Sequence, residues 1–399
     1  MTVGQTTAVT TTPSPYLRAE DCRLSDLLTI LEAATEGDLA AYPHASAMTQ
    51  GVLIYDAAPL RESLVDDGAR QAVHAEIARA LMAGPGIVVF TGAFDPAVID
   101  PVSAAFERII AQEKADGRVA GDHFAAPGAN DRMWNALEKL AIADPAAFVG
   151  YYANDIVALA ATAWLGPGYQ VTSQVNIVGP GGKGQTVHRD YHLGFQDPKV
   201  SEQFPTHVHA LSPVLTLQGA VAHIDMPVQT GPTLYLPHSQ KYPAGYLAYW
   251  LPEFQDYFVR HHIQLPLRKG DAVFFNPALF HAAGSNITAD VRRMANLLQI
   301  SSPFGRAMET IDRARVVEAI YPALLAAKDA GMPPADVDAV VAASAEGYAF
   351  PTNLDRDQPV GGMSPSTQAD LVRAALGARV SADELHETLS KNAFTRLSH

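Results

Sequence analysis

The sequence contains a single cysteine, comparatively few basic residues and no long apolar run. Because Cys22 is the only cysteine among 399 residues, no internal disulfide and no cluster of thiolate metal ligands can form, which fits a reducing cytoplasm. Acidic residues number 42 and basic residues 28, giving a net charge of −14. Since proteins that bind nucleic acids concentrate Lys and Arg against the phosphates, nucleic acid is not expected as a partner.

Every apolar run is shorter than the roughly 18 residues that a membrane-spanning helix needs, so no membrane partner is expected. Segment 1–15 also lacks the basic and apolar regions of a secretory signal. The composition includes 48% hydrophobic residues, which is ample for a folded core. The sequence therefore predicts a globular, cytoplasmic protein.

The pattern of apolar and turn-forming residues divides the chain into four parts. Residues 1–16 are rich in Thr, Pro and Ser and are predicted to form a disordered tail. Residues 17–85 are predicted to be an N-terminal helical segment, 86–305 the core, and 306–399 a C-terminal helical segment. The C-terminal helices carry no chemical motif, so we interpret them as packing or oligomer-forming elements. A homo-oligomer is accordingly among the expected assemblies.

The core segment contains several short strand-like runs separated by Pro, Gly, Asn and Asp, a pattern typical of a β-sandwich or jelly roll. Runs with helical periodicity precede and follow these strands. Strands are predicted at 87–90, 169–180, 211–223, 233–236, 263–267, 272–275 and 293–301, and helices at 24–34, 69–82, 95–113, 132–141, 145–164, 307–330, 334–343, 367–376 and after the capping residue Ser381.

A His-x-Asp motif, His188-Arg189-Asp190, is the strongest chemical signal in the chain. At strand spacing, residues two apart leave the same face of a sheet and can bind one cation. A second histidine, His281, ends an apolar run far downstream, and Arg292 follows it by eleven residues. Two His and one Asp form the facial triad that leaves positions open on non-haem Fe(II). An arginine is suited to bind the carboxylate of a co-substrate.

These motifs, in this order, resemble the phytanoyl-CoA dioxygenase family of Fe(II)/2-oxoglutarate oxygenases. The resemblance covers about residues 86–304 and also includes segments 222–225 and 231–239 and the Gly270-Asp271 pair before His281. It implies an α+β protein with a double-stranded β-helix core, that is, a cupin-like jelly roll, flanked by N- and C-terminal helices.

The resemblance implies Fe(II), 2-oxoglutarate and O2 as cofactor and co-substrates, with His188, Asp190 and His281 as metal ligands. Arg292 is expected to bind the far carboxylate of 2-oxoglutarate, with Arg293 pointing outward, because neighbours on a strand face opposite sides. Further co-substrate contacts are expected from inward polar side chains on neighbouring strands. The candidates are Gln174, Asn176 and Gln218.

The implied reaction is hydroxylation, or another oxidation, of an unactivated C–H bond, with release of succinate and CO2. Basic residues that could bind the phosphates of a CoA thioester are scattered, so a small metabolite or natural-product intermediate is favoured as the substrate. Two alternatives stay open: a non-redox Zn or Mn enzyme on the same barrel, and a non-catalytic, cupin-like ligand-binding protein. A Zn or Mn enzyme would leave Arg292 without a task, and a non-catalytic protein would not need all three metal ligands.

Other residues near these motifs have two interpretations each. The second His-x-Asp motif, His223-Ile224-Asp225, is interpreted as structural, with Asp225 ordering a turn. Loop 118–135, which carries Arg132 and Trp134, either covers a pocket or is an ordinary surface connection. Aromatic residues near the motifs either form the apolar wall of a pocket or belong to the core. They are Tyr191, Phe195 and Trp250.

Overall fold

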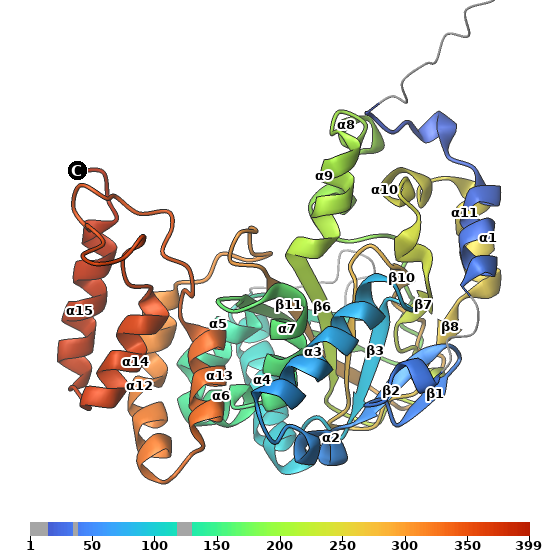
Figure 1. Cartoon of the computed structure of the whole chain (residues 1–399). Coiled ribbons are helices and arrows are strands. Elements are labelled where there is room, and N and C mark those ends of the chain that lie inside the picture. Colours follow the sequence, from blue (N-terminus) through green and yellow to red (C-terminus); the bar gives the residue numbers. More distant parts are fainter. Residues whose placement is uncertain (1–14, 35–38, 118–129) are drawn as a thin grey trace, which may run out of the picture.

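A large β-sheet, a small β-sheet and a thick layer of helices make up the protein (Figure 1). The structure is a computed structural model and describes residues 15–34, 39–117 and 130–399. The predicted disordered tail therefore lies, apart from its last two residues, outside the described residues.

The large sheet has eight strands in the order β1-β2-β3-β9-β6-β11-β5-β4, and the small sheet has three in the order β10-β7-β8. Only β2 and β3 among these pairs run parallel; the other neighbours are antiparallel. The two sheets and the helices confirm the predicted α+β jelly-roll class. The strands are β1 (Ala47–Thr49), β2 (Val52–Asp56), β3 (Ile87–Thr91), β4 (Asn130–Met133), β5 (Gln170–Val178), β6 (Thr216–Ala222), β7 (Leu234–Leu236), β8 (Ile263–Gln264), β9 (Ala272–Phe275), β10 (Phe280–Ala282) and β11 (Arg293–Ser301).

The strands of the large sheet alternate between two environments, as the two-residue period of a strand requires. On β11, Met294 and Leu298 pack into the core that the sheet shares with the helices. Ala295, Leu297 and Gln299 face the opposite side and line a cavity between the two sheets. Each central strand therefore contributes residues both to a packed core and to a pocket wall.

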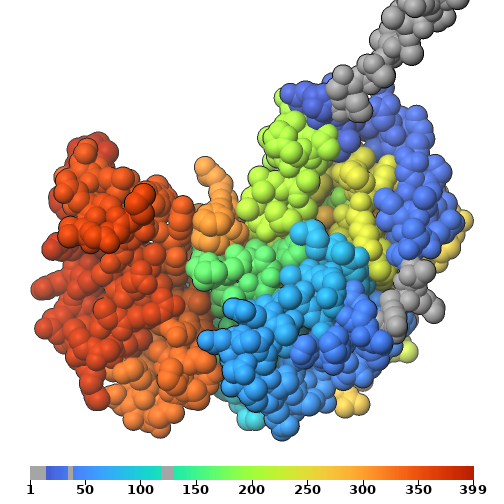
Figure 2. Space-filling view, viewed as in Figure 1, coloured from blue at the N-terminus to red at the C-terminus, as the bar shows by residue number. Residues whose placement is uncertain are grey.

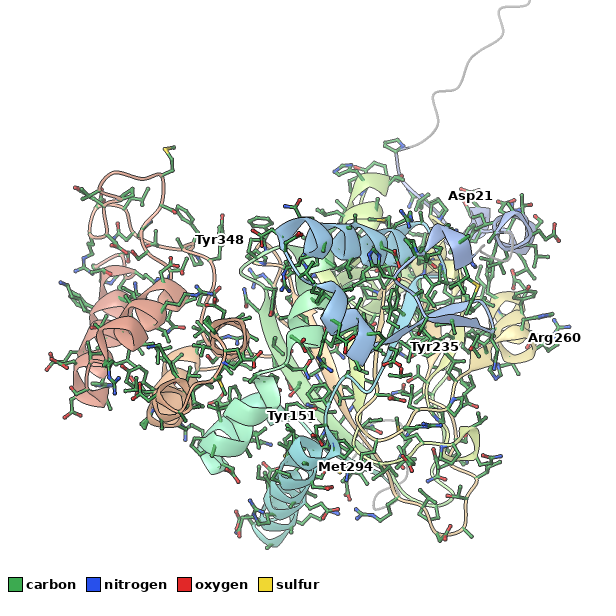
Figure 3. All side chains as sticks on the ribbon, turned by 60° about the horizontal axis from the view of Figure 1, so that its bottom comes forward. Asp21, Tyr151, Tyr235, Arg260, Met294 and Tyr348 are labelled. Carbon is green, nitrogen blue, oxygen red and sulfur yellow. The ribbon has the colours of Figure 1, made fainter. Side chains whose placement is uncertain are left out.

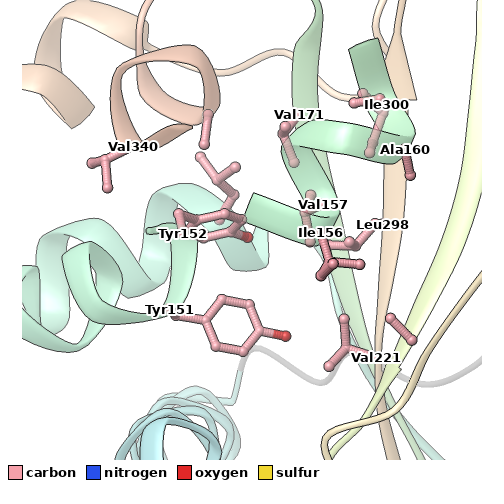
Figure 4. Packing of buried hydrophobic residues seen from close by; sticks show 14 of the residues in the cluster. Tyr151, Tyr152, Ile156, Val157, Ala160, Val171, Val221, Leu298, Ile300 and Val340 are labelled. Carbon is pink, nitrogen blue, oxygen red and sulfur yellow. The ribbon is translucent and has the colours of Figure 1, made fainter. Parts of the chain in front are cut away.

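The helices cover one face of the large sheet. In Figure 4, Tyr151 and Tyr152 of α6 and Ile156 of α7 approach Leu298 and Val221 of the sheet. The main helices are α1 (Leu24–Ala33), α2 (Ala57–Ser63), α3 (Asp67–Met82), α4 (Pro96–Ala115), α5 (Ala136–Ala143), α6 (Pro145–Tyr152), α7 (Asp155–Leu165), α9 (Thr206–Leu211), α11 (Pro252–His261), α12 (Arg313–Asp329), α13 (Pro334–Ser344), α14 (Gln368–Ala378) and α15 (Ala382–Thr395), with the single turns α8 (Pro198–Ser201) and α10 (Gly245–Ala248).

Polar caps define where several helices begin. The side chain of Asp95 accepts the Ala97 N–H at the start of α4. Ser381 and Glu384 form a reciprocal capping box at the start of α15, as its sequence predicts. These side chains satisfy N–H groups that the first turn of a helix leaves without backbone partners.

Several predicted elements differ in the structure. The strand predicted over 211–223 begins as β6 at Thr216, because 211–215 belong to the end of α9 and to a 3-10 helix. The N-terminal segment contains β1 and β2 as well as helices, because β2 pairs with the buried strand β3. Arg132 lies in β4, which pairs with β5, and not in a helix. The helix predicted over 145–164 is broken between α6 and α7, where Asn154 caps α7 by accepting the Val157 N–H.

The C-terminal helices α12 to α15 extend the helical layer away from the sheets. Figure 2 shows a notch in the surface between these helices and the segment that contains α8 and α9. No helix in the described ranges is both long enough and apolar enough to span a membrane.

Candidate active site

A cavity of about 820 Å³ lies between the two sheets. Its walls are mainly apolar, and they come from the inner faces of β3, β5, β6, β9 and β11 and from the small sheet. In Figure 3, Tyr235, a cavity residue, lies on the other side of the large sheet from Tyr151 and Met294, which belong to the helix-side core. A volume of this size suits a small molecule together with a co-substrate.

His188, Asp190 and His281 meet in the wall of this cavity and form a group that can hold a metal ion. Their ligand atoms lie within 4.8 Å of one another. His188 Nε2 is 3.7 Å from Asp190 Oδ1, and His281 Nε2 is 3.4 Å from Asp190 Oδ2. The three side chains that the sequence predicts as metal ligands are thus brought together.

Backbone contacts fix the two imidazoles. His188 pairs with His281 of β10 through reciprocal backbone N–H···O bonds of 2.9 and 3.2 Å. His188 Nδ1 lies 2.8 Å from the Thr186 carbonyl, and His281 Nδ1 lies 2.8 Å from the Leu279 carbonyl. A carbonyl only accepts, so each Nδ1 carries the proton and each Nε2 presents its lone pair to the cluster.

The protonation states also fit a divalent cation. The pKa of Asp190 is held well below its usual range: burial opposes ionisation, but nearby His188, His281 and the Gln218 amide outweigh that effect. Burial, followed by the neighbouring His281, lowers the pKa of His188. A metal site needs deprotonated ligands, and two imidazoles with one carboxylate are the donor set of a facial Fe(II) site.

Arg292 and Arg293 occupy opposite faces at the start of β11. Arg293 is buried, with 6% of its surface exposed, and lines the cavity. Its Nη2 donates to Asn176 Oδ1 at 3.3 Å. Arg292 lies at the surface, where its Nη2 is 3.4 Å from Asp131 Oδ2. The predicted orientation, with Arg292 inward and Arg293 outward, is therefore wrong.

The alternation of β11 explains this reversal. Arg292 is in phase with Met294 and Leu298, which face the helices, whereas Arg293 is in phase with Ala295 and Gln299, which face the cavity. The sequence of β11 does not reveal these phases clearly, because polar Asn296 shares the phase of Met294 and Leu298, and apolar Leu297 shares the phase of Ala295 and Gln299. The spacing from His281 therefore predicts Arg292, which is one residue before the arginine that lines the cavity.

Gln174, Asn176 and Gln218 all line the cavity, as their strand positions predict. Gln174 and Asn176 lie on β5 beside Leu297 and Ala295 of β11. Gln218 lies on β6 and donates from Nε2 to Asp190 Oδ2 at 2.5 Å. This contact to a candidate metal ligand is not evident from the sequence, because the two residues are distant along the chain.

The second His-x-Asp motif lies outside the cluster. His223 is buried on the helix side of the sheet, 2.8 Å from Ser103 Oγ at Nδ1 and 3.1 Å from the Tyr151 hydroxyl at Nε2. Burial lowers the pKa of His223 to about 3. Asp225 accepts the Lys269 N–H at 2.9 Å. Both placements agree with the structural interpretation of this motif.

Aromatic and charged side chains surround the rest of the cavity. Phe195 and Trp250 line it and are about half exposed, whereas Tyr191 is buried and donates its hydroxyl to Gln299 Oε1 at 2.8 Å. Arg132 and Trp134 also line the cavity, with the guanidinium 5.1 Å from the ring centroid. The remainder of the predicted covering loop, 118–129, lies outside the described residues.

Residues 83–294 match the phytanoyl-CoA dioxygenase (PhyH) family. No curated protein matches the chain. Several solved structures are similar to the chain at low identity. The epimerase SnoN of nogalamycin biosynthesis is 19% identical, with 60% of this chain and 84% of SnoN covered and a TM-score of 0.37. The carbocyclase SnoK of the same biosynthesis is 19% identical, with 57% and 83% covered and a TM-score of 0.42.

A third similar structure is HygX from Streptomyces hygroscopicus with nickel, 2-oxoglutarate and hygromycin B bound. It is 14% identical, with 59% of this chain and 90% of HygX covered and a TM-score of 0.41.

Proposed function

Because the chain belongs to the phytanoyl-CoA dioxygenase family, we propose that it is an Fe(II)- and 2-oxoglutarate-dependent oxygenase that oxidises a C–H bond of a small metabolite or natural-product intermediate. The cofactors are those that the sequence predicts: Fe(II), 2-oxoglutarate and O2. The observation that carries the proposal is the combination, in one largely apolar cavity, of the His188, Asp190 and His281 cluster with a buried arginine, Arg293.

Each of the three cluster residues has a defined task. His188 and His281 bind the metal through Nε2, since both Nδ1 atoms face carbonyl oxygens, and Asp190 supplies one carboxylate oxygen. Bound iron, with 2-oxoglutarate and O2, supplies the oxidising chemistry. Three protein ligands on one side leave the other side of the metal open to the co-substrate and O2.

Arg293 is the residue that we assign to the far carboxylate of 2-oxoglutarate, in place of Arg292. Its guanidinium is buried in the cavity wall beside Asn176. A planar guanidinium can bind a carboxylate through two parallel hydrogen bonds, and these are stronger where water is excluded. Gln174 and Asn176 lie on the adjacent strand, where their amides can donate to the same co-substrate.

The substrate is proposed to enter past Phe195 and Trp250, the half-exposed aromatic side chains of the cavity wall. The deeper wall is formed by apolar side chains, among them Val273, Phe275 and Leu297. Such a wall keeps water away from the reacting centre. Halogenation by related enzymes uses a metal site that lacks the carboxylate ligand. Because Asp190 fills this position here, we propose oxidation of the substrate and not halogenation.

The test is anaerobic addition of Fe(II) and 2-oxoglutarate to the purified protein, followed by visible spectroscopy and then admission of O2. We expect a charge-transfer band on chelation of the keto acid and slow formation of succinate in air. A Zn or Mn enzyme, or a ligand-binding protein without iron, gives neither signal. Absence of both the band and succinate would overturn the proposal.

A further inference from the structure

Gln218 lies on β6 next to the candidate metal centre. It is 3% exposed and lines the cavity. Its Nε2 donates to Asp190 Oδ2 at 2.5 Å, whereas its Oε1 is buried without a hydrogen-bond partner in the described part of the chain. The side chain therefore uses its donor on a metal ligand and leaves its acceptor unused.

The chemistry of Asp190 fixes which way this amide is turned. If the amide were flipped, Oε1 would face a carboxylate oxygen, and two acceptors cannot form a hydrogen bond. A carboxylate that binds a metal is deprotonated and only accepts hydrogen bonds, so the atom of Gln218 that lies 2.5 Å from Asp190 Oδ2 is a donor. Gln218 must therefore present Nε2, and not Oε1, to Asp190.

This orientation argues against a primary role in binding 2-oxoglutarate, the task that the sequence suggests for Gln218. At neutral pH, 2-oxoglutarate carries two carboxylates and a ketone, all of which accept hydrogen bonds. The Oε1 of Gln218 is buried and is also an acceptor, and the Nε2 already donates to Asp190. Gln174 and Asn176, which lie away from this contact, remain candidates for the co-substrate.

The backbone around the two residues differs in regularity. Gln218 is paired on both sides, with Phe275 of β9 and with Gln299 of β11. Asp190 belongs to no strand ladder, and the next residue, Tyr191, has φ of 63°. A side chain fixed in the middle of the sheet thus holds a ligand that lies on an irregular segment.

We propose that Gln218 is a positioning residue for the metal ligand Asp190. Its amide donates to Oδ2 and holds the carboxylate with Oδ2 3.4 Å from His281 Nε2 and Oδ1 3.7 Å from His188 Nε2, so that the carboxylate faces both imidazoles of the cluster. The inference rests on the proposed function, because it assigns a task at the same metal centre. Partners of this kind orient metal ligands, and their loss typically weakens metal binding about 10- to 100-fold.

The experiment compares two affinities in the purified full chain under anaerobic conditions. The first is the affinity for Fe(II), measured with excess 2-oxoglutarate from the charge-transfer band. The second is the affinity for 2-oxoglutarate, measured at saturating Fe(II). Gln218→Leu removes the donor, and Gln218→Asn keeps an amide but shortens its reach. Gln299→Leu is the matched control, because Gln299 faces the same cavity from the paired strand and bonds to Tyr191 instead of Asp190.

For both Gln218 variants we expect Fe(II) affinity about 10- to 100-fold weaker and a shifted band, with 2-oxoglutarate affinity at saturating metal changed less than about threefold. The Gln299 control should keep the wild-type Fe(II) affinity. The opposite pattern, unchanged Fe(II) affinity with weak 2-oxoglutarate binding, would overturn the proposal, as would wild-type values for both affinities. If Gln218→Leu does not fold, Gln218→Asn decides alone. A wild-type protein that gives no band would instead refute the proposed function.

Discussion

Histidine and amide side chains lie on both sides of the eight-stranded sheet, but their hydrogen-bond partners differ between the two sides. On the helix side, His223 is held at both ring nitrogens, by Ser103 and by Tyr151, and the Tyr151 hydroxyl in turn accepts from Asn296 Nδ2 at 3.1 Å. On the cavity side, His188 and His281 each bond a backbone carbonyl through Nδ1, and each Nε2 faces the Asp190 carboxylate in the cluster.

This difference separates a structural histidine from a ligand. A buried polar group is stable when the protein supplies its hydrogen-bond partners. The network of Ser103, Tyr151 and Asn296 does this for His223. The cavity side instead arranges nitrogen and oxygen donors around a common point with mutual distances below 4.8 Å. The two His-x-Asp motifs therefore differ in role, and the groups that face the ring nitrogens distinguish them: hydroxyl groups at both nitrogens of His223, and a carboxylate shared by the Nε2 atoms of His188 and His281.

The largest expected effect comes from removing a ligand on the cavity side. Alanine at His188, Asp190 or His281 should abolish Fe(II) binding and succinate formation, because two protein ligands leave an incomplete coordination shell. Circular dichroism should show that the fold survives. His223→Ala provides the contrast, since it should retain iron. Full activity in His281→Ala, or loss of metal in His223→Ala, would reverse the assignment of the two motifs.

The two neighbouring arginines sharpen the comparison at a single strand. Arg293→Leu should weaken 2-oxoglutarate binding at least thirtyfold, because truncating one partner of a buried charged pair costs about 2 kcal/mol or more. Arg292→Leu should leave 2-oxoglutarate binding nearly unchanged. It removes only a surface ion pair with Asp131, and such a pair contributes about 0–1 kcal/mol to the stability of the fold. Titration of 2-oxoglutarate into the Fe(II)-loaded variants measures both. Equal effects would show that the two faces do not separate these side chains.

Leu297 and Leu298 test the packing of the two faces in the same way. Leu298 is fully buried in the helix-side core, so Leu298→Ala should lower the free energy of unfolding by about 3 kcal/mol. Leu297 borders the cavity, and Leu297→Ala should cost about 1 kcal/mol, because the side chain is packed on fewer sides. Urea unfolding measures the difference. A larger loss in Leu297→Ala would contradict it.

The last expected effect develops only as the solution is acidified, and it is the pH dependence that His223 confers. The folded protein keeps this imidazole neutral, with a pKa of about 3, whereas the unfolded chain binds a proton near pH 6.5. Stability is therefore unaffected by this group above about pH 6.5 and is lost as pH falls below it, by up to about 1.4 kcal/mol per pH unit.

His223→Phe should remove this component and should already be less stable at pH 7, because Ser103 and Tyr151 lose their partner. Urea unfolding at pH 7 and pH 5 should show about 2 kcal/mol less acid sensitivity in the variant than in the wild-type protein. Equal acid sensitivity in the two proteins would mean that His223 is protonated in the folded state.

The jelly-roll class, most helices and strands, and the His188, Asp190 and His281 cluster could be predicted from the sequence. Strands such as β9 and β11 follow from local alternation bounded by turn residues, and the α15 cap follows from Ser381 and Glu384. The β1 and β2 strands could not be predicted, because a short strand such as β2 is stabilised by its pairing with β3, which no local pattern encodes.

The sequence by itself determined which residue types form the candidate site: two histidines, one aspartate and an arginine. Their order and spacing along the chain are those of the family. Only the tertiary structure decided which arginine faces the cavity, since a shift of one residue along a strand reverses every side chain. It also decided the contact between Gln218 and Asp190, because hydrogen bonds between distant segments depend on how the strands are paired and not on any local pattern.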